Sequence, residues 1–288
     1  MTRPFYLTDN AISEFITTAL AEDIGEGDHS SLGSISKADR SKAQLLIKDD
    51  GIIAGLELAE KIFHQFDPAL QIQFLKKDGD LVRKGEVAFY VEGSSRSILS
   101  TERLVLNCMQ RMSGIATYTH QLSQLISGTK AQLKDTRKTT PNFRLMEKWA
   151  VAIGGGKNHR FALYDMVMLK DNHIDMAGGI KQAISNTKSY LKAIGKNLSI
   201  EVETRTLAEV GEVLAAGGAE VIMLDNMSVE ETRKAVMIID GKCKTEASGG
   251  ITEATLRQVA ETGVDYISVG ALTHSVKSLD LSLKAIKQ

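Results

Sequence analysis

Cationic side chains gather in one stretch of the sequence, residues 134–173. This stretch has eight Lys/Arg against four Asp/Glu, although the whole chain has a formal net charge of −1. The charges cluster at the ends of apolar runs rather than along one helix face: Arg137 and Lys138; Lys157, His159 and Arg160; Lys170 and His173. This pattern is typical of several loops that converge on a small anionic ligand, and it does not favour a broad basic surface for nucleic acid.

Two acidic residues form the counterpart of these cations. Glu203 stands at the end of the predicted strand SIEVE, and Asp225 follows the apolar run VIML. Such a carboxylate pair can hold Mg²⁺ through water, bind sugar hydroxyls or stabilise a developing oxocarbenium ion. The alternative is a pair of buried structural carboxylates.

Two glycine-containing segments have the form of a phosphate-binding site. Ser248, Gly249 and Gly250 precede a predicted helix, and Gly270 opens the segment GALTHS after the last predicted strand. Glycine lets the backbone approach an anion, and the N–H groups at a helix start can bind it. Ordinary glycine turns remain the alternative.

The pattern leaves more than one interpretation open for four residues. Arg103 shares a helical stripe with Asn107 and Arg111, so it is either a solvated surface residue or a residue that reaches a ligand or a neighbouring subunit. Lys170 follows a strand, where a Schiff-base lysine of a barrel aldolase would also stand. His159 and His173 fit no zinc-binding spacing, and the surrounding cations would repel a metal.

The elements that position these residues alternate from about residue 130 onward. Six apolar strands are each followed by a loop and most by a helix, and the polar residues above fall directly after the strands. Buried strands with intervening helices predict a parallel α/β arrangement, and in α/β barrels the catalytic edge lies at the carboxyl ends of the strands. The predicted helices include Leu207–Ala216, one capped by Thr140 with Pro141 in first position and ending at Ile153, and a final helix after residue 275.

The first third of the chain has a different pattern. A helix is predicted from Thr8 to Ile24, and a β-rich module follows over residues 43–99, with a short helix over 58–66. A second helix is predicted over residues 99–114, with Gly114 as its end.

Composition narrows the class of protein. The chain has 288 residues, a sequence pI near 6.6 and only two cysteines, Cys108 and Cys243, which we expect to be buried thiols. The first ten residues contain no apolar signal segment, and no apolar run approaches membrane-spanning length. We therefore expect a cytoplasmic protein that acts without nucleic acid or membrane.

Several motifs together resemble one family. DTRKTTP, GGGKNHR, MLKDNHI, EVE, MLDN, ASGGI and SVGALTHS, preceded by EDIGEGD and TERLVLNCMQRMSGIAT, are similar to the carboxylating nicotinate-nucleotide pyrophosphorylases, or quinolinate phosphoribosyltransferases. The resemblance implies a transferase that joins quinolinate to phosphoribosyl pyrophosphate with Mg²⁺, and releases pyrophosphate and CO₂ in NAD biosynthesis. It also implies a β-rich α+β domain over residues 1–114, an incomplete, seven-stranded α/β barrel over residues 115–288, and a homodimer, or a larger assembly of dimers.

The resemblance assigns roles to the residues that match the motifs. Arg137, His159 and Arg160, with Arg103 from the partner chain, would bind the two carboxylates of quinolinate. Lys138 and Lys170 would lie between the pyridine carboxylate and the pyrophosphate, and Glu203 and Asp225 would face the ribose and Mg²⁺. The 5′-phosphate would lie against Ser248, Gly249, Gly250 and Gly270, with His274 nearby.

The sequence departs from the family pattern at two positions. Asn142 stands where glycine usually follows TTP, and Lys157 stands where histidine is common in GGGHNH. Neither change removes a charge that the reaction needs. The alternatives to this assignment are a paralogue associated with molybdenum transport, a Schiff-base aldolase that uses Lys170, and a sensor that binds phosphoribosyl pyrophosphate or a dinucleotide precursor.

Overall fold

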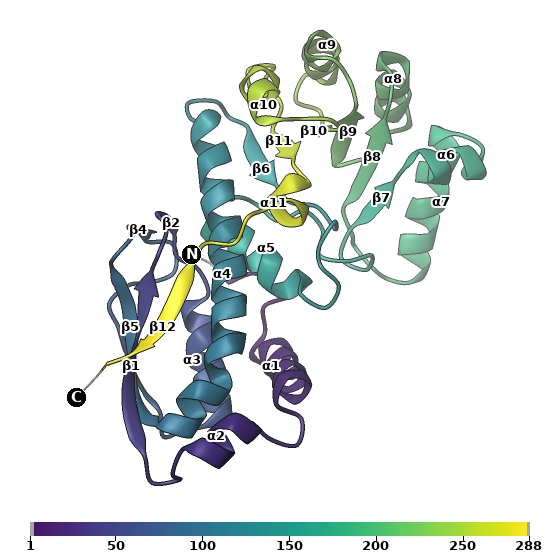
Figure 1. Ribbon diagram of the computed structural model, residues 1–288. Helices are drawn as coiled ribbons and strands as arrows, with labels where there is room; N and C mark the ends of the chain where they lie inside the picture. Colours follow the sequence, from purple (N-terminus) through teal and green to yellow (C-terminus); the bar gives the residue numbers. More distant parts are fainter. Residues whose placement is uncertain (1–2, 287–288) are drawn as a thin grey trace. The chain divides into compact units, whose positions relative to one another are not determined.

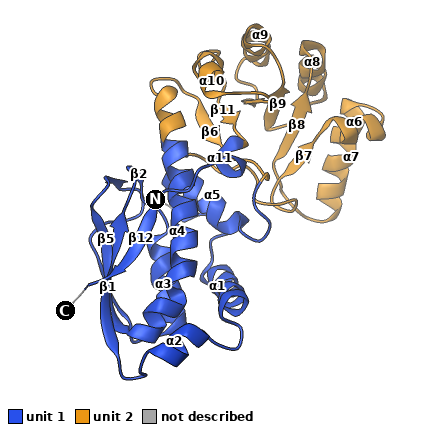
Figure 2. Ribbon diagram, in the orientation of Figure 1, with its two compact units in different colours: residues 1–120, 139–155, 271–288 blue, residues 121–138, 156–270 orange. Residues whose placement is uncertain are grey.

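The computed structural model describes residues 3–286, which form two compact units (Figure 2). Within these residues, unit 1 comprises residues 3–120, 139–155 and 271–286, and unit 2 comprises residues 121–138 and 156–270. Both units are assembled from separate segments, whereas the sequence suggested a single boundary after residue 114. That boundary stays a prediction about domains.

Unit 1 contains an antiparallel sheet with the strand order β12-β1-β5-β3 (Figure 1). Its strands are β1 (Arg40–Ile47), β3 (Gln71–Phe74), β5 (Val87–Ser94) and β12 (Leu281–Ala285), and β2 (Gly51–Ile52) pairs separately with β4 (Leu81–Val82). Alternate residues of β1 are buried, as expected for a sheet with one face on a core. The β-rich character predicted for residues 43–99 is therefore confirmed.

The predicted final helix is wrong, because residues 281–285 form strand β12. Leu281 and Leu283 are buried and alternate with Ser282 and Lys284, which is the period of a strand. The strand pairs with β1 and sets Leu283 opposite Leu45. Between residues 269 and 280, the structure has only the four-residue helix α11 (Ala271–His274).

Helices α1 and α4 test the predicted helix ends. Helix α1 (Asp9–Ile24) begins as expected, because the hydroxyl of Thr8 accepts a hydrogen bond from the Ala11 N–H. Helices α2 (His29–Ser34) and α3 (Leu56–Phe66) are short. Helix α4 (Ser95–Leu125) runs well past Gly114, so this glycine does not end it. A side chain at Gly114 would collide with the carbonyl oxygen of Lys277, which explains the glycine as a close backbone approach.

Helix α5 (Arg144–Ile153) begins three residues later than predicted. Thr140 does not cap it, because its N–H and hydroxyl both donate to the carboxylate of Glu147. Asn142 lies in the left-handed region with a φ of 62°. Asparagine tolerates this conformation better than most residues, so it can replace the glycine of the family pattern here.

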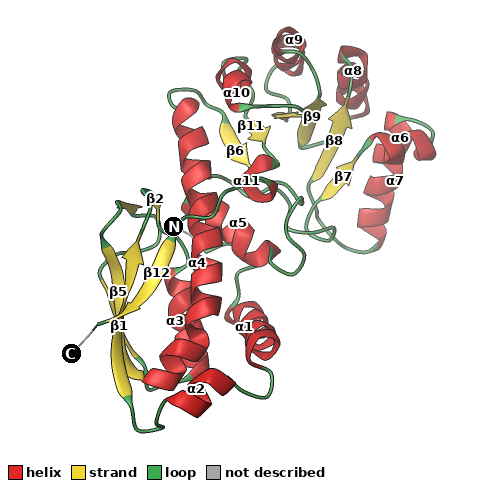
Figure 3. Ribbon diagram, in the orientation of Figure 1, coloured by secondary structure: helices red, strands yellow, loops and turns green. Residues whose placement is uncertain are grey.

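Unit 2 is built on a six-stranded parallel sheet (Figure 3). Its order is β6 (Gln132–Lys134), β11 (Tyr266–Ser268), β10 (Lys244–Ser248), β9 (Val221–Asp225), β8 (Ile200–Thr204) and β7 (Val167–Leu169). The predicted parallel α/β arrangement is confirmed. The incomplete, seven-stranded barrel stays a prediction, since Lys157 adds only an isolated parallel bridge to Lys134 in β6.

Helices connect the strands of unit 2. They are α6 (Asp171–Ala177), α7 (Ile180–Ala193), α8 (Leu207–Ala216), α9 (Val229–Ile239) and α10 (Glu253–Ala260). Helices α7 to α10 pack consecutively against one another. Among residues 3–286, no helix combines the length and apolarity that a membrane crossing requires.

Candidate active site

The carboxyl ends of neighbouring strands bring several predicted site residues to one edge of the unit 2 sheet. Glu203 lies near the end of β8, Asp225 is the last residue of β9, and Ser248 is the last residue of β10. The strand register places Asp225 directly beside Ser248. Parallel strands end at a common edge, so the acids and the predicted phosphate-binding segment lie along the same line.

Lys170 directly follows β7 and forms an ion pair with Glu203. Its Nζ lies 3.4 Å from the carboxylate of Glu203, and the lysine side chain is 48% exposed. The backbone N–H of Lys170 donates to the Nδ1 of His173, which fixes the start of α6. A Schiff-base lysine is usually activated by desolvation or by a neighbouring cation, and the carboxylate partner provides neither.

The loops after β9 and β10 pack closely against each other at Gly249. Gly249 and Gly250 have φ values of 90° and 61°, which side chains rarely adopt. A side chain at Gly249 would also collide with that of Asn226, whose N–H donates to the carbonyl of Ser248. The amide of Asn226 in turn donates to Asp225 over 2.7 Å. The segment predicted to bind phosphate is therefore joined directly to one of the two acids.

Arg137 and Arg160 lie close enough to repel each other. Burial lowers the pKa of Arg160, and the positive charge of Arg137 lowers it further, while Glu201 and Asp165 act in the opposite direction. Both arginines are half-buried, and Lys138 beside Arg137 is exposed. An anion with two carboxylates would relieve this repulsion, which supports the predicted carboxylate-binding role.

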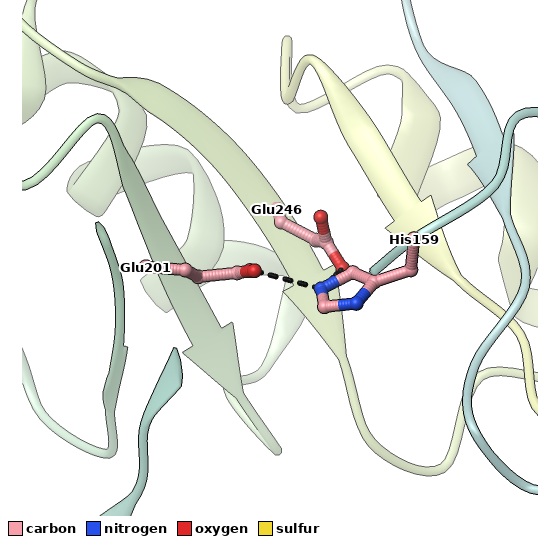
Figure 4. A group of neighbouring side chains, drawn as sticks. All are labelled: His159, Glu201 and Glu246. Carbon is pink, nitrogen blue, oxygen red and sulfur yellow. Dashed lines mark hydrogen bonds and ion pairs between the residues drawn. The ribbon is translucent and has the colours of Figure 1, made fainter. Parts of the chain in front are cut away.

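His159 lies between two buried glutamates that the sequence analysis missed (Figure 4). Its Nε2 is 2.7 Å from Oε2 of Glu201 in β8 and 3.5 Å from Oε1 of Glu246 in β10. Glu246 also accepts from Lys134 over 2.6 Å and from the hydroxyl of Ser268. Burial raises the pKa of Glu246, and the charge of Glu201 raises it further, although His159 and Lys134 oppose the shift. The signal for both glutamates was a charged residue at a buried strand position, in IEVE and KTEAS.

These three side chains also have the donor atoms of a metal site. The ligand atoms of His159, Glu201 and Glu246 all lie within 4.8 Å of one another. Lys134 already supplies a cation to Glu246, and the 2.7 Å hydrogen bond joins His159 directly to Glu201. The cluster is therefore a hydrogen-bonded charge network, distinct from the acids predicted to hold Mg²⁺.

Two predicted site residues and one cysteine lie in unit 1. Arg103 is exposed on α4, and Nδ1 of His274 in α11 lies 2.6 Å from the hydroxyl of Ser275. The binding roles of both residues stay predictions. Gly270, the last residue of unit 2, follows β11.

Burial raises the pKa of Cys108 to about 12, so it is an inert thiol, whereas Cys243 in unit 2 is only half-buried.

Comparisons with known proteins agree with this arrangement. Residues 17–113 match the family model for the N-terminal domain of quinolinate phosphoribosyl transferase, and residues 115–284 match the model for its C-terminal domain. The chain is 48% identical over 284 residues to a chloroplastic nicotinate-nucleotide pyrophosphorylase [carboxylating] of Arabidopsis thaliana, covering 93% of this chain and 81% of that protein. It is 45% identical over 262 residues to a probable pyrophosphorylase of the same name from Bacillus subtilis, covering 91% and 89%.

Solved structures show the same fold. The crystal structure of NadC from Streptococcus pyogenes superimposes with a TM-score of 0.91 at 39% identity and covers 100% of both chains. The nicotinate-nucleotide pyrophosphorylase of Francisella tularensis gives a TM-score of 0.90 at 39% identity, with 97% and 98% covered. Both domain models of the family match, and the relatives cover nearly the whole chain. The polar residues also lie at the strand ends of a parallel sheet. This chain therefore belongs to the quinolinate phosphoribosyltransferase family.

Proposed function

We propose that the chain transfers the phosphoribosyl group of phosphoribosyl pyrophosphate to quinolinate, and forms nicotinate mononucleotide, pyrophosphate and CO₂ for NAD biosynthesis. The proposal rests on one observation above all. Unit 2 combines a repelling pair of arginines with two acids and a glycine loop at the strand ends. The first group suits a dicarboxylate, and the second suits a sugar phosphate.

The two substrates would use different parts of this edge. Arg137, His159 and Arg160 bind the carboxylates of quinolinate, because guanidinium groups form paired hydrogen bonds with carboxylates. Ser248, Gly249, Gly250 and Gly270 hold the 5′-phosphate through backbone N–H groups. The family resemblance adds His274 to this group of phosphate-binding residues. Lys138 and Lys170 stand between the pyridine carboxylate and the pyrophosphate, where they offset negative charge.

Glu203 and Asp225 stabilise positive charge on the ribose. The pyridine nitrogen attacks the anomeric carbon as the bond to pyrophosphate breaks, and the two carboxylates favour the cationic character of the ribose in that state. Both are oxygen donors at least partly open to solvent at the strand ends, so they would also hold Mg²⁺, which offsets charge on the pyrophosphate when bound.

Loss of CO₂ follows from the first step. Once the ring nitrogen carries a positive charge, the carbon beside it can accept the electron pair of the breaking C–C bond. That carbon then takes a proton from water, which completes nicotinate mononucleotide. The protein contributes by holding the ring in place through the second carboxylate.

The assembly and location are further parts of the proposal. We infer a homodimer in which Arg103 of one chain reaches quinolinate bound to the other, since Arg103 is exposed on α4. We infer a cytoplasmic location, as expected from the sequence, although a plant relative is named chloroplastic. An aldolase reaction is disfavoured because Lys170 is exposed and ion-paired.

A labelled substrate tests the proposed reaction directly. Quinolinate labelled at the carboxyl beside the ring nitrogen is supplied with phosphoribosyl pyrophosphate and Mg²⁺, and CO₂ and nucleotide are measured together. We expect equal amounts of both products. Nicotinate, which has one carboxylate fewer, serves as the matched control acceptor and should react poorly. A folded protein that releases no CO₂ would contradict the proposal.

A further inference from the structure

The feature that the proposed reaction does not yet use is the pair of glutamates around His159. Both carboxylates are fully buried, and His159 itself is only 8% exposed. The imidazole contacts them through the same nitrogen, Nε2, while the Nδ1 edge of the ring faces away from both (Figure 4). The glutamates come from different strands, β8 and β10, so only the folded sheet brings them together.

This network is poorly arranged for stability alone. A buried carboxylate is costly unless its oxygens accept hydrogen bonds. Both oxygens of Glu246 have partners, in Lys134, Ser268 and His159. Within the described residues, Oε1 of Glu201 is buried without a hydrogen-bond partner. An unsatisfied buried carboxylate oxygen beside a histidine calls for an explanation other than packing.

The backbone around the ring is fixed as well. The N–H of His159 donates to Asp135 over 2.8 Å, and the amide of Asn158 donates to the same carboxylate over 2.7 Å. Asp135 directly follows β6, so the segment that carries His159 is attached to the sheet. Glu201 also acts on the neighbouring Arg160 through its charge. The same carboxylate therefore faces two of the residues assigned to the dicarboxylate.

We propose that Glu201 and Glu246 are positioning residues that hold Nε2 of His159 and balance its charge, so that the ring presents its Nδ1 edge to a carboxylate of quinolinate. An imidazole that donates from both nitrogens is a cation, and Glu201 supplies the matching negative charge next to it. This inference rests on the proposed function, because it assumes that quinolinate is the ligand.

The first test removes the negative charge and keeps the shape of the side chain. Quinolinate binding to Glu201→Gln is measured by calorimetry, together with KM for both substrates. We expect the quinolinate Kd to rise on the order of tenfold, because a hydrogen bond to a charged group is weakened. The KM for phosphoribosyl pyrophosphate should stay within about twofold, as expected for a site that this carboxylate does not reach. Glu209→Gln is the matched control. Glu209 lies on helix α8 of the same unit, and its carboxylate forms an ion pair with Arg205.

A double-mutant cycle tests whether Glu201 acts through His159. His159→Gln alone should weaken quinolinate binding, and adding Glu201→Gln should then change the Kd by less than about twofold. Independent, multiplying effects would overturn the proposal. So would a Glu201→Gln protein with a lower melting temperature and an unchanged quinolinate Kd, which is the result of a purely structural role.

A second variant keeps the test decisive if Glu201→Gln does not fold. Glu246→Gln should raise the quinolinate Kd in the same direction but less, because its oxygen lies farther from Nε2. The proposed reaction and the proposed role of the glutamates would be contradicted by different results. A wild-type protein that neither binds quinolinate nor releases CO₂ overturns both, whereas a wild-type protein that does both, with unchanged binding in the two variants, overturns only the role of the glutamates.

Discussion

Each unit buries a carboxylate network, and the two networks differ in how completely they are satisfied. In unit 1, Glu147 of α5 accepts four hydrogen bonds, two from the guanidinium of Arg111 and two from Thr140. Arg111 also donates to the carbonyls of Thr273 and Val276. In unit 2, Glu201 has one partner at one oxygen and none at the other among the described residues.

The difference separates a structural use of buried charge from a functional one. The Glu147 network joins α4, α5 and the segment that leads to β12, and nothing in it is left unsatisfied. Such networks hold one conformation. The Glu201 network leaves an oxygen unpaired next to a residue assigned to substrate, which is the expected cost of a site prepared for a ligand that is not yet bound.

Removing Glu147 gives the largest expected effect. In Glu147→Ala the guanidinium of Arg111 loses its carboxylate partner, and Thr140 loses the two hydrogen bonds that it donates to Glu147. The free energy of unfolding should fall by about 3 kcal/mol, as is common when one member of a buried ion pair is removed. Urea denaturation followed by circular dichroism measures this loss.

Glu201→Gln is the matched comparison for that experiment. It should lose less stability than Glu147→Ala and more affinity for quinolinate. If the two variants lose stability and affinity in the same proportion, the distinction between the networks is wrong.

Two glycines extend the comparison to the backbone. Gly114→Ala in α4 should lower the free energy of unfolding by about 1–3 kcal/mol, because the new methyl group meets the backbone at Lys277. It should leave the KM for phosphoribosyl pyrophosphate unchanged. Gly249→Ala, which meets Asn226 and a φ of 90°, should raise that KM by about tenfold or more, since the phosphate loop must shift. Equal effects of both substitutions on KM would count against the loop assignment.

A pH series gives the smallest expected effect and sharpens the account of Glu246. Burial and Glu201 raise its pKa above the ordinary value of 4.5, even though Lys134 lies only 2.6 Å away. The contribution of Glu246 to stability is therefore fully present below about pH 4.5 and declines as the pH rises through the raised value. Relative to the wild type, Glu246→Gln should gain stability as the pH is raised from 5 toward 8.

Asp265→Asn is the control with the opposite sign. Burial raises the pKa of Asp265, but hydrogen bonds from Thr245 and Lys244 outweigh it and leave the pKa lowered. Its stabilising contribution is present at neutral pH and is lost as the pH falls, so this variant should approach the wild type only in acid. Both series are measured as free energies of unfolding in urea, and a flat difference between Glu246→Gln and the wild type would contradict the shift.

Local signals made much of the fold predictable from the sequence. Helix α8 was predicted over its full range, because its apolar spacing is regular and Gly217 ends it. The start of α5 was not, because Pro141 reads as a first helical residue while Thr140 is in fact bound to Glu147. Strand β12 was missed because its partner, β1, lies more than two hundred residues earlier.

The residues of the candidate site also differ in how far they could be predicted from the sequence. Residues at or directly after the end of a strand, such as Asp225 and Lys170, could be found because position along a strand is visible in the sequence. Glu201 and Glu246 were visible only as charged residues within buried strands, and their meeting at His159 could not be predicted, since it depends on which strands are neighbours. Sheet order is a property of the whole chain, and no local pattern specifies it.

The pairing of β12 with β1 has a consequence for how the protein is made. On the ribosome, residues 40–47 are synthesised more than two hundred residues before their partner, residues 281–285. Unit 2 is complete by residue 270, so it can fold while β1 still exposes one unpaired edge. The nascent chain therefore carries an open strand edge throughout that interval, in which chaperones or early contact with another copy can act on it.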